Sequence, residues 1–352
     1  MDLHLYYCSS CVHAYLDPIP PSSVIADFYK HNYDYYTSPL ESQLTTQITS
    51  IPIQYIRERI IAHFGRKVSM VDVGGSDGYS LVQLQDLAEE RLLIEPSGFA
   101  STIAKKFGVP VLEKFLDDEL AAELEGKFDV VINRHVIEHL EDSRKFAHQL
   151  LKLLKPEGLL CIETPDLTRV LGDTLVRVVS LQHLNYFSTQ SLQKLIGDVG
   201  SIESIQRIEN YAFLACITKG GNIEHKLNNA YWLEQAKTFD VRLRKHCGKL
   251  KKRVETWKGR KIWLWGAGSA GGEIYHVYNF KPGLFAGYID SDPRKINKRF
   301  VSAPELPIVT ADEAHNRGVD AVVITSYSVK EITARIKQLD WNVPVTSIYS
   351  HA

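Results

Sequence analysis

Residues 71–80 read VDVGGSDGYS, an apolar strand that runs into a glycine-rich turn with an acid on either side. Asp72 lies on the strand, and Gly74 and Gly78 belong to the turn. A dinucleotide site uses the spacing G-x-G-x-x-G, because the second glycine lets the backbone approach a pyrophosphate at a helix N-terminus. Ser76 stands at that second position here. The turn therefore predicts a nucleotide ligand that has no pyrophosphate.

S-adenosylmethionine is such a ligand, since it carries an amino-acid end and a ribose. The next predicted strand ends in LLIEPS and places Glu95 23 residues after Asp72, where an acid at a strand end can accept both ribose hydroxyls. A later strand, FDVVINR, also ends in polar residues, and strand ends at one edge of such a sheet converge on the ligand crevice. The predicted donor-binding residues are Asp72, Gly74, Gly75, Ser76, Gly78, Glu95, Pro96, Asn133 and Arg134. A purely structural turn and a solvated acid at Glu95 are the alternatives.

Apolar strand-like runs alternate with helix-like periods through two stretches of the chain, which is typical of βαβ units. We predict an α/β protein with a Rossmann-like sheet in residues 51–220, which the donor-binding residues above mark as an S-adenosylmethionine-dependent methyltransferase domain. A second, smaller Rossmann-like α/β domain is predicted in residues 259–352. Residues 1–50 are rich in Tyr, Pro and Ser and predict a small lobe, and the charged residues 221–258 predict a helical connector.

The composition is that of an ordinary soluble globular protein, with 44% apolar residues, 24% charged residues and a formal charge of -1. This charge lacks the basic excess of a nucleic-acid binder. No apolar run reaches the roughly 20 residues of a membrane helix, and the start MDLHLYYCSS lacks the pattern of a signal peptide. We therefore expect a cytoplasmic protein with no nucleic-acid or membrane partner. The five cysteines do not suggest a disulfide framework.

Several motifs in order along the chain resemble the sugar C-methyltransferases of deoxysugar biosynthesis, a group of class I S-adenosylmethionine-dependent methyltransferases. The matching pieces are LHLYYCSSCVHAYLDP, NYDYYTS, VDVGGSDGYS with LLIEPS, NRHVIEHLED, LQHLNYFSTQSL, and WLWGAGSAGG with YIDSDPRK. The resemblance implies a cysteine-rich zinc-type lobe, a central methyltransferase domain and a C-terminal Rossmann-like domain. It also implies a nucleotide-linked 4-ketosugar as acceptor, whose enolate attacks the sulfonium methyl group.

The resemblance implies that His183 is the base that removes the acidic proton beside the ketone. The family has Tyr-His-Glu-His followed by Leu and then Tyr-Phe-Ser, whereas this chain reads SLQHLNYFS. Gln182 stands in place of the Glu and Ser180 in place of the Tyr, and the family's His-Gly-Gly-Ser stretch is missing. A structural or substrate-positioning role for His183 is the alternative. O- or N-methylation of a related sugar is the alternative reaction.

Two further matches concern aromatic and imidazole side chains. Tyr33 and Tyr35 match the family's Tyr-x-Tyr pattern, in which a phenol can donate a hydrogen bond to the substrate. Packing of the lobe onto the core is the alternative for both. His139 also has a family counterpart, with a hydrogen-bonded histidine in the wall of the donor pocket as the alternative.

The lobe contains one C-x-x-C pair, Cys8 and Cys11. A structural zinc site is tetrahedral and needs four ligands, commonly from two such pairs. The sequence therefore predicts no metal ligands and two buried reduced thiols, with a zinc ion bound by Cys8 and Cys11 as the alternative.

A second glycine turn, formed by Gly266, Gly268 and Gly271, has the dinucleotide spacing. Asp290 follows Gly266 by 24 residues, close to the ~20 expected of an acid that binds the ribose of NAD. Only about half of a full dinucleotide fold remains after Gly266, however, and no acid/base set follows. We interpret this domain as the part that holds the nucleotide of a nucleotide-sugar substrate, with a purely structural role or a catalytically silent nucleotide-sugar or NAD-binding protein as alternatives. The sequence does not predict an oligomeric state.

Overall fold

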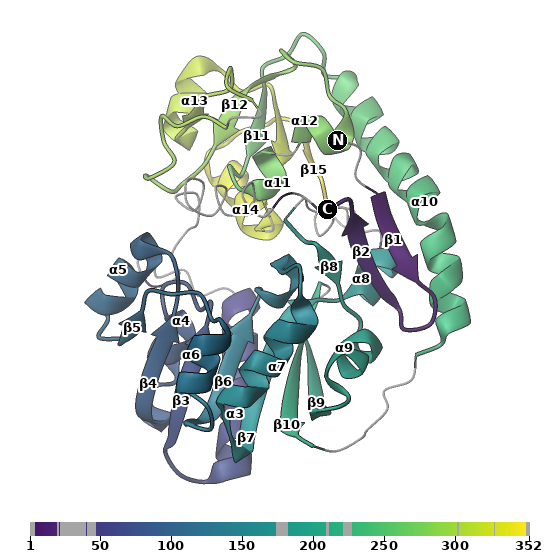
Figure 1. The fold of residues 1–352 in the computed structure, drawn as a ribbon. Helices are drawn as coiled ribbons and strands as arrows, with labels where there is room; N and C mark the ends of the chain where they lie inside the picture. The colour runs from purple at the N-terminus through teal and green to yellow at the C-terminus, as the bar shows by residue number, and fades with distance from the viewer. Residues whose placement is uncertain are drawn as a thin grey trace. The chain divides into compact units, whose positions relative to one another are not determined.

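The chain divides into two compact units, Met1–Lys237 and Thr238–Ala352, in a computed structural model. The residues that the structure describes are 4–19, 21, 40, 47–173, 182–208, 211–220, 227–272, 274–300, 303–326 and 328–349. The first unit contains a seven-stranded and a three-stranded sheet, and the second unit contains a five-stranded sheet (Figure 1). The predicted α/β class with a second, smaller sheet is confirmed.

The seven-stranded sheet has the order β5-β4-β3-β6-β7-β10-β9. Its strands are β3 (Val68–Val73), β4 (Ala88–Ile94), β5 (Val111–Leu112), β6 (Phe128–Arg134), β7 (Leu154–Pro165), β9 (Gly200–Ile208) and β10 (Ala212–Lys219). Neighbours from β5 to β7 are parallel, whereas β10 is antiparallel to both β7 and β9. The apolar runs of the sequence do not predict β9, because many of its residues are polar and partly exposed at the sheet edge.

Helices cover both faces of this sheet because alternate strand residues point to opposite sides. Val71 and Val131 pack in one core with α6, α7 and α9, whereas Met70 and Val130 pack in a second core with α3, α4 and α5. The helical elements are α3 (Gln47–Phe64), α4 (Tyr79–Gln83), η2 (Gln85–Leu87), α5 (Gly98–Lys106), α6 (Asp118–Glu123), η3 (Ile137–His139), α7 (Ser143–Leu153), α8 (Leu167–Asp173) and α9 (Thr189–Ile196).

The strand order places a topological switch point between β3 and β6. The chain builds the sheet outward from β3 through β4 to β5, and then returns to add β6 on the other side of β3. In open α/β sheets, ligands bind beyond the carboxyl ends of the strands at such a point. The glycine turn after β3 and the polar residues at the end of β6 therefore lie where the fold favours a ligand site.

The N-terminal hairpin consists of β1 (His4–Cys8) and β2 (His13–Asp17), and β2 pairs with β8 (Asn185–Tyr186). The Leu16 N–H donates to the Leu184 carbonyl at 3.0 Å. His13 Nε2 lies 3.2 Å from Asn185 Oδ1. The lobe therefore fixes the backbone immediately after His183.

The five-stranded sheet of the second unit is wholly parallel, in the order β13-β12-β11-β14-β15. Its strands are β11 (Ile262–Trp265), β12 (Phe285–Ile289), β13 (Ile308–Val309), β14 (Ala321–Ile324) and β15 (Val345–Ser347). The helices are α10 (Asn229–Glu255), which is divided between the two units, α11 (Ser269–Gly272), α12 (Ile274–Tyr278), α13 (Ala311–Arg317) and α14 (Val329–Gln338). The proposed boundaries at residues 50, 220 and 258 stay predictions.

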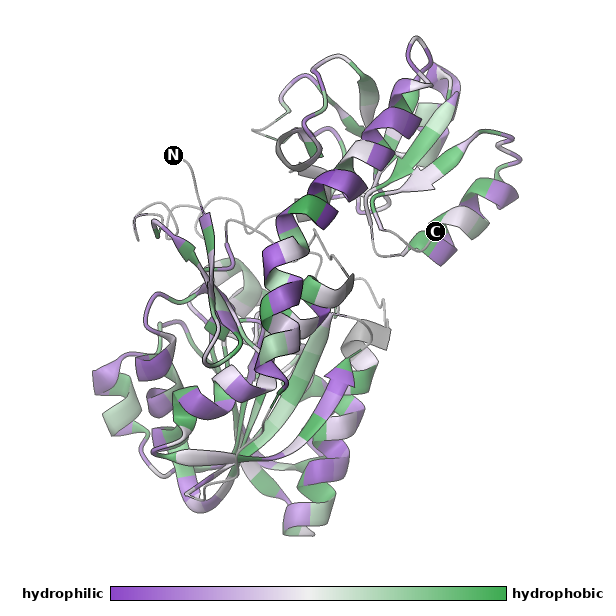
Figure 2. Ribbon diagram, turned by 90° about the vertical axis from the view of Figure 1, so that its right-hand side faces the viewer, coloured by the Kyte–Doolittle hydropathy of each residue, from purple (hydrophilic) through white to green (hydrophobic). Residues whose placement is uncertain are grey.

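Many strand residues are hydrophobic (green in Figure 2), whereas much of the long helix α10 is hydrophilic (purple). This matches the burial of α10, in which Phe239, Leu250 and Val254 are the buried residues. Among the described helices, none has both the length and the apolar character that crossing a membrane requires.

Candidate active site

The glycine turn after β3 requires glycine for two physical reasons. Gly74 has φ 72, a left-handed conformation that side chains disfavour. A Cβ at this position would lie 2.5 Å from Val136 Cγ2. Its N–H donates to the carbonyl of Ile94 at 2.8 Å, which fixes the turn to the end of β4. The segment just before η3 therefore packs directly on the turn.

Glu95 and the glycine turn are joined by hydrogen bonds. The N–H groups of Ser76 and Ser97 donate to the two carboxylate oxygens of Glu95, each at 2.9 Å. Burial raises the pKa of Glu95, and these two N–H groups act in the opposite direction. A carboxylate oxygen has two lone pairs, so each oxygen can accept one further hydrogen bond. Glu95 is thus held in a fixed orientation at the place predicted for the ribose.

Asp72 is fully buried beneath the turn, and neither of its carboxylate oxygens has a hydrogen-bond partner. A Cβ on Gly75 would lie 2.3 Å from Asp72 Cγ, so the turn backbone covers this acid closely. Burial raises the pKa of Asp72 to about 7, although the positive charge of Arg134 acts in the opposite direction. A buried carboxylate without partners is unfavourable unless a cation or a donor group satisfies it.

The other predicted donor-binding residues differ in their hydrogen-bond partners and in their exposure to solvent. Asn133 is fully buried and donates from Nδ2 to the Val73 carbonyl at 2.9 Å, while its Oδ1 has no hydrogen-bond partner. Arg134 uses its Nε to pair with Glu163 at 2.5 Å. Pro96 is exposed. Asn133 therefore combines with Asp72 as a second buried acceptor at the switch point, whereas Arg134 is held by an ion pair within the sheet.

A charged cluster that the sequence reasoning missed lies beside these residues. His135 has its Nδ1 3.2 Å from Glu138 and its Nε2 3.2 Å from Glu163. Although burial acts to lower it, these carboxylates raise the pKa of His135 to about 10. In the same way, His135 lowers the pKa of Glu138 to about 2 against the effect of burial. Both glutamates are therefore ionised at neutral pH, although they are buried.

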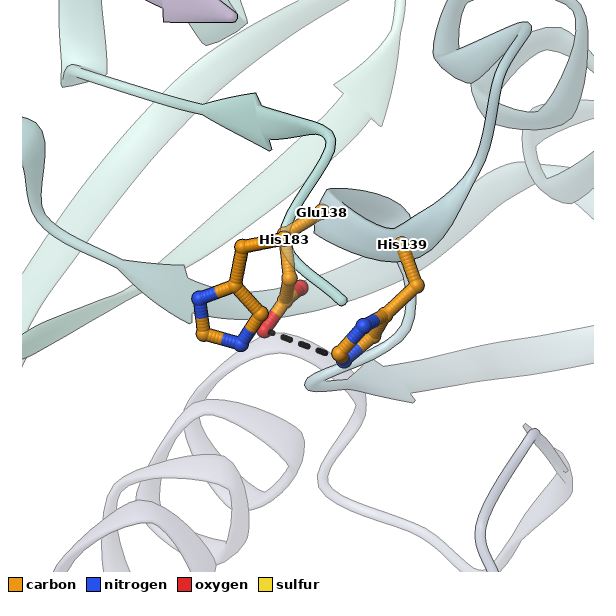
Figure 3. A group of neighbouring side chains, drawn as sticks. All are labelled: Glu138, His139 and His183. Atoms are coloured by element: carbon orange, nitrogen blue, oxygen red, sulfur yellow. Dashed lines mark ion pairs between the residues drawn. The ribbon is translucent and has the colours of Figure 1, made fainter. Parts of the chain in front are cut away.

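His183, the predicted base, is half-buried and lies next to this cluster. A ring nitrogen of His183, one of His139 and a carboxylate oxygen of Glu138 all lie within 4.8 Å of one another. Figure 3 shows the Glu138 carboxylate between the two imidazole rings. Gln182 stands where the family has an acid, but Glu138 brings an acid to His183 from a different segment. The sequence could not show this because the two segments meet only in the folded chain.

His139 forms a hydrogen bond, as the alternative to a functional role predicted for it. Its Nδ1 lies 2.8 Å from the backbone carbonyl of Gln182. The Nδ1 therefore carries the hydrogen, because a carbonyl can only accept. This bond connects η3 to the loop that carries His183.

The rest of the HLNYFS motif supports the loop. Tyr186 and Phe187 are fully buried. The Ser188 hydroxyl accepts from the Ser191 N–H at 3.1 Å and caps α9. Asn185 Nδ2 donates to the Leu140 carbonyl at 2.7 Å. These residues fix the position of His183.

The remaining sequence predictions lie outside this group. Tyr33 and Tyr35 fall outside the described residues, so their roles stay predictions. Cys8 and Cys11 are free and partly exposed, where buried thiols were expected. The hydrogen bond with Ser10 lowers the pKa of Cys8 to about 7.

At the second glycine turn, the carboxylate of Asp290 has partners from nearby residues of the same unit. Asp290 accepts from the Ala267 N–H at 2.8 Å and from the Asp292 N–H at 2.9 Å. The ammonium group of Lys295 lies 3.3 Å from the same carboxylate. Asp290 therefore stabilises its own turn.

Residues 49–200 match a protein family described as "Methyltransferase domain". The matched residues are less than half of the chain, and the sheet order described above agrees with the fold of class I S-adenosylmethionine-dependent methyltransferases. S-adenosylmethionine, the predicted cofactor, is the methyl donor of this class.

The chain is similar to two curated proteins named ubiquinone biosynthesis O-methyltransferase. That of Rhizobium etli (strain CIAT 652) is 30% identical over 131 residues, which cover 34% of this chain and 53% of the relative. That of Rickettsia akari (strain Hartford) is 30% identical over 154 residues, covering 41% and 60% respectively. The chain thus spans just over half the length of these relatives.

A solved structure, the Burkholderia thailandensis 1,6-didemethyltoxoflavin-N1-methyltransferase with bound 1,6-didemethyltoxoflavin and S-adenosylhomocysteine, is also similar. It has a TM-score of 0.44 and 14% identity, and the match covers 63% of this chain and 100% of that one.

Proposed function

We propose that this chain transfers a methyl group from S-adenosylmethionine to a carbon of a nucleotide-linked keto-deoxysugar. The observation that carries the proposal is the placement of His183 beside the buried carboxylate of Glu138. These residues lie next to the segment that packs on the donor turn through Val136 and Gly74. An acid/base pair is thereby brought to the same end of the sheet as the predicted donor site.

In this reaction His183 removes the proton on the carbon beside the ketone. The resulting enolate carbon attacks the sulfonium methyl group, and S-adenosylhomocysteine leaves. A neutral imidazole has a suitable basicity near neutral pH, and an adjacent carboxylate stabilises the imidazolium that forms. The interpretation of the second unit as a nucleotide-binding part stays a prediction from the sequence. Location in the cytoplasm and the lack of nucleic-acid or membrane partners stay predictions.

Transfer to an oxygen atom is the second candidate, because the relatives described above are named O-methyltransferases. His183 would then remove a hydroxyl proton. The two candidates use the same donor site and the same base, and they differ in whether a carbon-bound proton is lost.

Deuterium exchange separates them. With S-adenosylhomocysteine bound, we expect the wild-type chain to exchange the α-proton of a nucleotide-linked 4-ketosugar with solvent deuterium, measured by mass spectrometry. His183→Asn is expected to slow exchange and methylation by roughly 100-fold or more, the contribution of a positioned base. His63→Asn, at the exposed end of α3, is the matched control. Methylated product without exchange would support O-methylation, and no S-adenosylhomocysteine from S-adenosylmethionine with any nucleotide sugar would contradict the proposal.

A further inference from the structure

Glu138, His139 and His183 form the one group in the described part of the chain that has three or more closely placed potential metal ligands. One ligand atom from each residue lies within 4.8 Å of the other two. Figure 3 shows that the side chains come from two segments and gather around one point. The sequence predicted no metal ligands, because the lobe offers only one C-x-x-C pair.

The Glu138 oxygen of this group lies 3.2 Å from His135 Nδ1, and its distance to His139 exceeds that of a hydrogen bond. Glu138 Oε1 and His139 Nε2 are 4.0 Å apart, beyond the 2.7–3.2 Å range of an N–H···O bond. Ligands at 2.0–2.1 Å from a tetrahedral ion lie about 3.4 Å from one another. Side-chain movements of about 1 Å would therefore bring the three atoms to the distances that a cation requires.

Neighbouring groups orient two of the three ligands. The His139 Nδ1–H donates to the Gln182 carbonyl at 2.8 Å, which directs the lone pair of the neutral ring to Nε2, the nitrogen nearest Glu138. Thr164 donates its hydroxyl to Glu138 Oε2 at 3.1 Å. Ligating histidines and carboxylates are typically held by such outer hydrogen bonds.

We propose that Glu138, His139 and His183 bind a divalent transition-metal cation of the zinc type. Two imidazoles and one carboxylate are a ligand set of catalytic zinc sites, which keep a fourth position open for an oxygen atom. Mg²⁺ prefers oxygen ligands alone, whereas imidazole suits Zn²⁺ and its first-row neighbours. The open position would take water or an oxygen of the methyl acceptor.

The consequence for the reaction rests on the proposed function. A ring nitrogen that binds the cation does not accept a proton, so His183 acts directly as the base only in the cation-free chain. In the loaded chain, a cation held by these residues would act as a Lewis acid that lowers the pKa of the acceptor group at its open position, so that the acceptor proton is released to solvent. The acceptor anion then attacks the sulfonium methyl group and S-adenosylhomocysteine leaves. Loss of His183 abolishes proton removal by either route.

Co²⁺ is the probe, because its visible absorption reports its ligands. The titration uses the full chain with Cys8→Ser and Cys11→Ser, which removes the thiols of the lobe as a competing site. We expect one equivalent of Co²⁺ to bind, and Zn²⁺ to displace it. His139→Ala and His183→Ala in that background should each weaken binding by roughly 10- to 100-fold or more. His63→Ala is the control for loss of an unrelated histidine, and thermal unfolding checks that each variant is folded.

Failure of stoichiometric Co²⁺ binding in the cysteine-substituted chain would overturn the proposal, as would binding that neither histidine variant weakens. The outcome is independent of the methyltransferase assay. A chain that methylates its acceptor in the presence of a chelator and binds no cation contradicts the cation site alone. A chain that binds Co²⁺ through these residues but produces no S-adenosylhomocysteine contradicts the proposed function alone.

Discussion

The two glycine turns are attached to the neighbouring strand in the same way. In each, the N–H of the first glycine donates at 2.8 Å to the last residue of that strand, Gly74 to Ile94 and Gly266 to Ile289. Each first glycine has positive φ and lies against another segment of its own unit. The first turn has two further residues with positive φ, Ser76 and Gly78, and the two turns also differ in their acids.

Asp72 at the first turn has no hydrogen-bond partner on either oxygen, whereas Asp290 at the second accepts two N–H groups and pairs with Lys295. Glu95 also accepts two N–H groups around its turn, but Asp290 has the ammonium group of Lys295 in addition. A buried acid without partners is costly, and a ligand can recover that cost. We infer that Asp72 is available to a ligand at the first turn, whereas Asp290 stabilises the second turn.

The largest effect is expected from Gly74→Val. The new side chain meets Val136 and adopts a positive φ, so the turn moves and donor affinity falls by more than about 100-fold. Calorimetric titration with S-adenosylhomocysteine measures this. Gly65→Val is the matched control, since Gly65 has φ 61 but open space around it. Undiminished affinity in Gly74→Val would remove the donor turn from the site.

Opposite effects on stability are expected at the two acids. The folded pKa of Asp72, about 7, exceeds its ordinary value of 3.8, so the native state binds more protons between these values. Stability therefore falls as the pH rises from about 4 to 7, by up to about 4 kcal/mol. Asp72→Asn should be more stable than the wild type above pH 7, with the difference vanishing near pH 4, and it should bind the donor more weakly.

Asp290→Asn should instead destabilise the second unit by about 1–3 kcal/mol at neutral pH, because it leaves Lys295 without its ion pair and weakens the turn. Thermal unfolding of both variants across pH checks the pair. If Asp72→Asn is less stable than the wild type at pH 8, Asp72 stabilises the fold as Asp290 does, and the two turns do not differ in this respect.

The smallest effect is expected from Gly268→Ala. A Cβ at this position meets no atom within 4 Å, and Gly268 is not among the glycines with positive φ. We expect unchanged donor affinity and a change in stability of less than about 1 kcal/mol. A loss of nucleotide-sugar binding in this variant would instead show that the second turn contacts the nucleotide sugar.

The sequence predicted those parts of the molecule that local patterns encode. The apolar runs predicted β3, β4 and β6 well, and the turn 74–78 followed from its glycines. The edge strand β9 was missed because polar residues separate its isoleucines, so it has no continuous apolar run. Tertiary contacts could not be predicted in this way.

The candidate site shows the same limit. His183 was found by a motif, but Glu138 was not, since it approaches His183 only through the packing of η3 on the loop before β8. Most of the motif around His183 proved to be structural support, including the α9 cap at Ser188. A motif can therefore mark a loop without showing which of its residues do chemistry.

The central claim is that the first turn binds the methyl donor and that the second turn does not bind NAD. Calorimetric titration of the wild-type chain with S-adenosylhomocysteine, and separately with NAD, tests it most directly. We predict one equivalent of S-adenosylhomocysteine bound per chain and no heat of binding from NAD. Stoichiometric binding of NAD with no binding of S-adenosylhomocysteine would contradict the account.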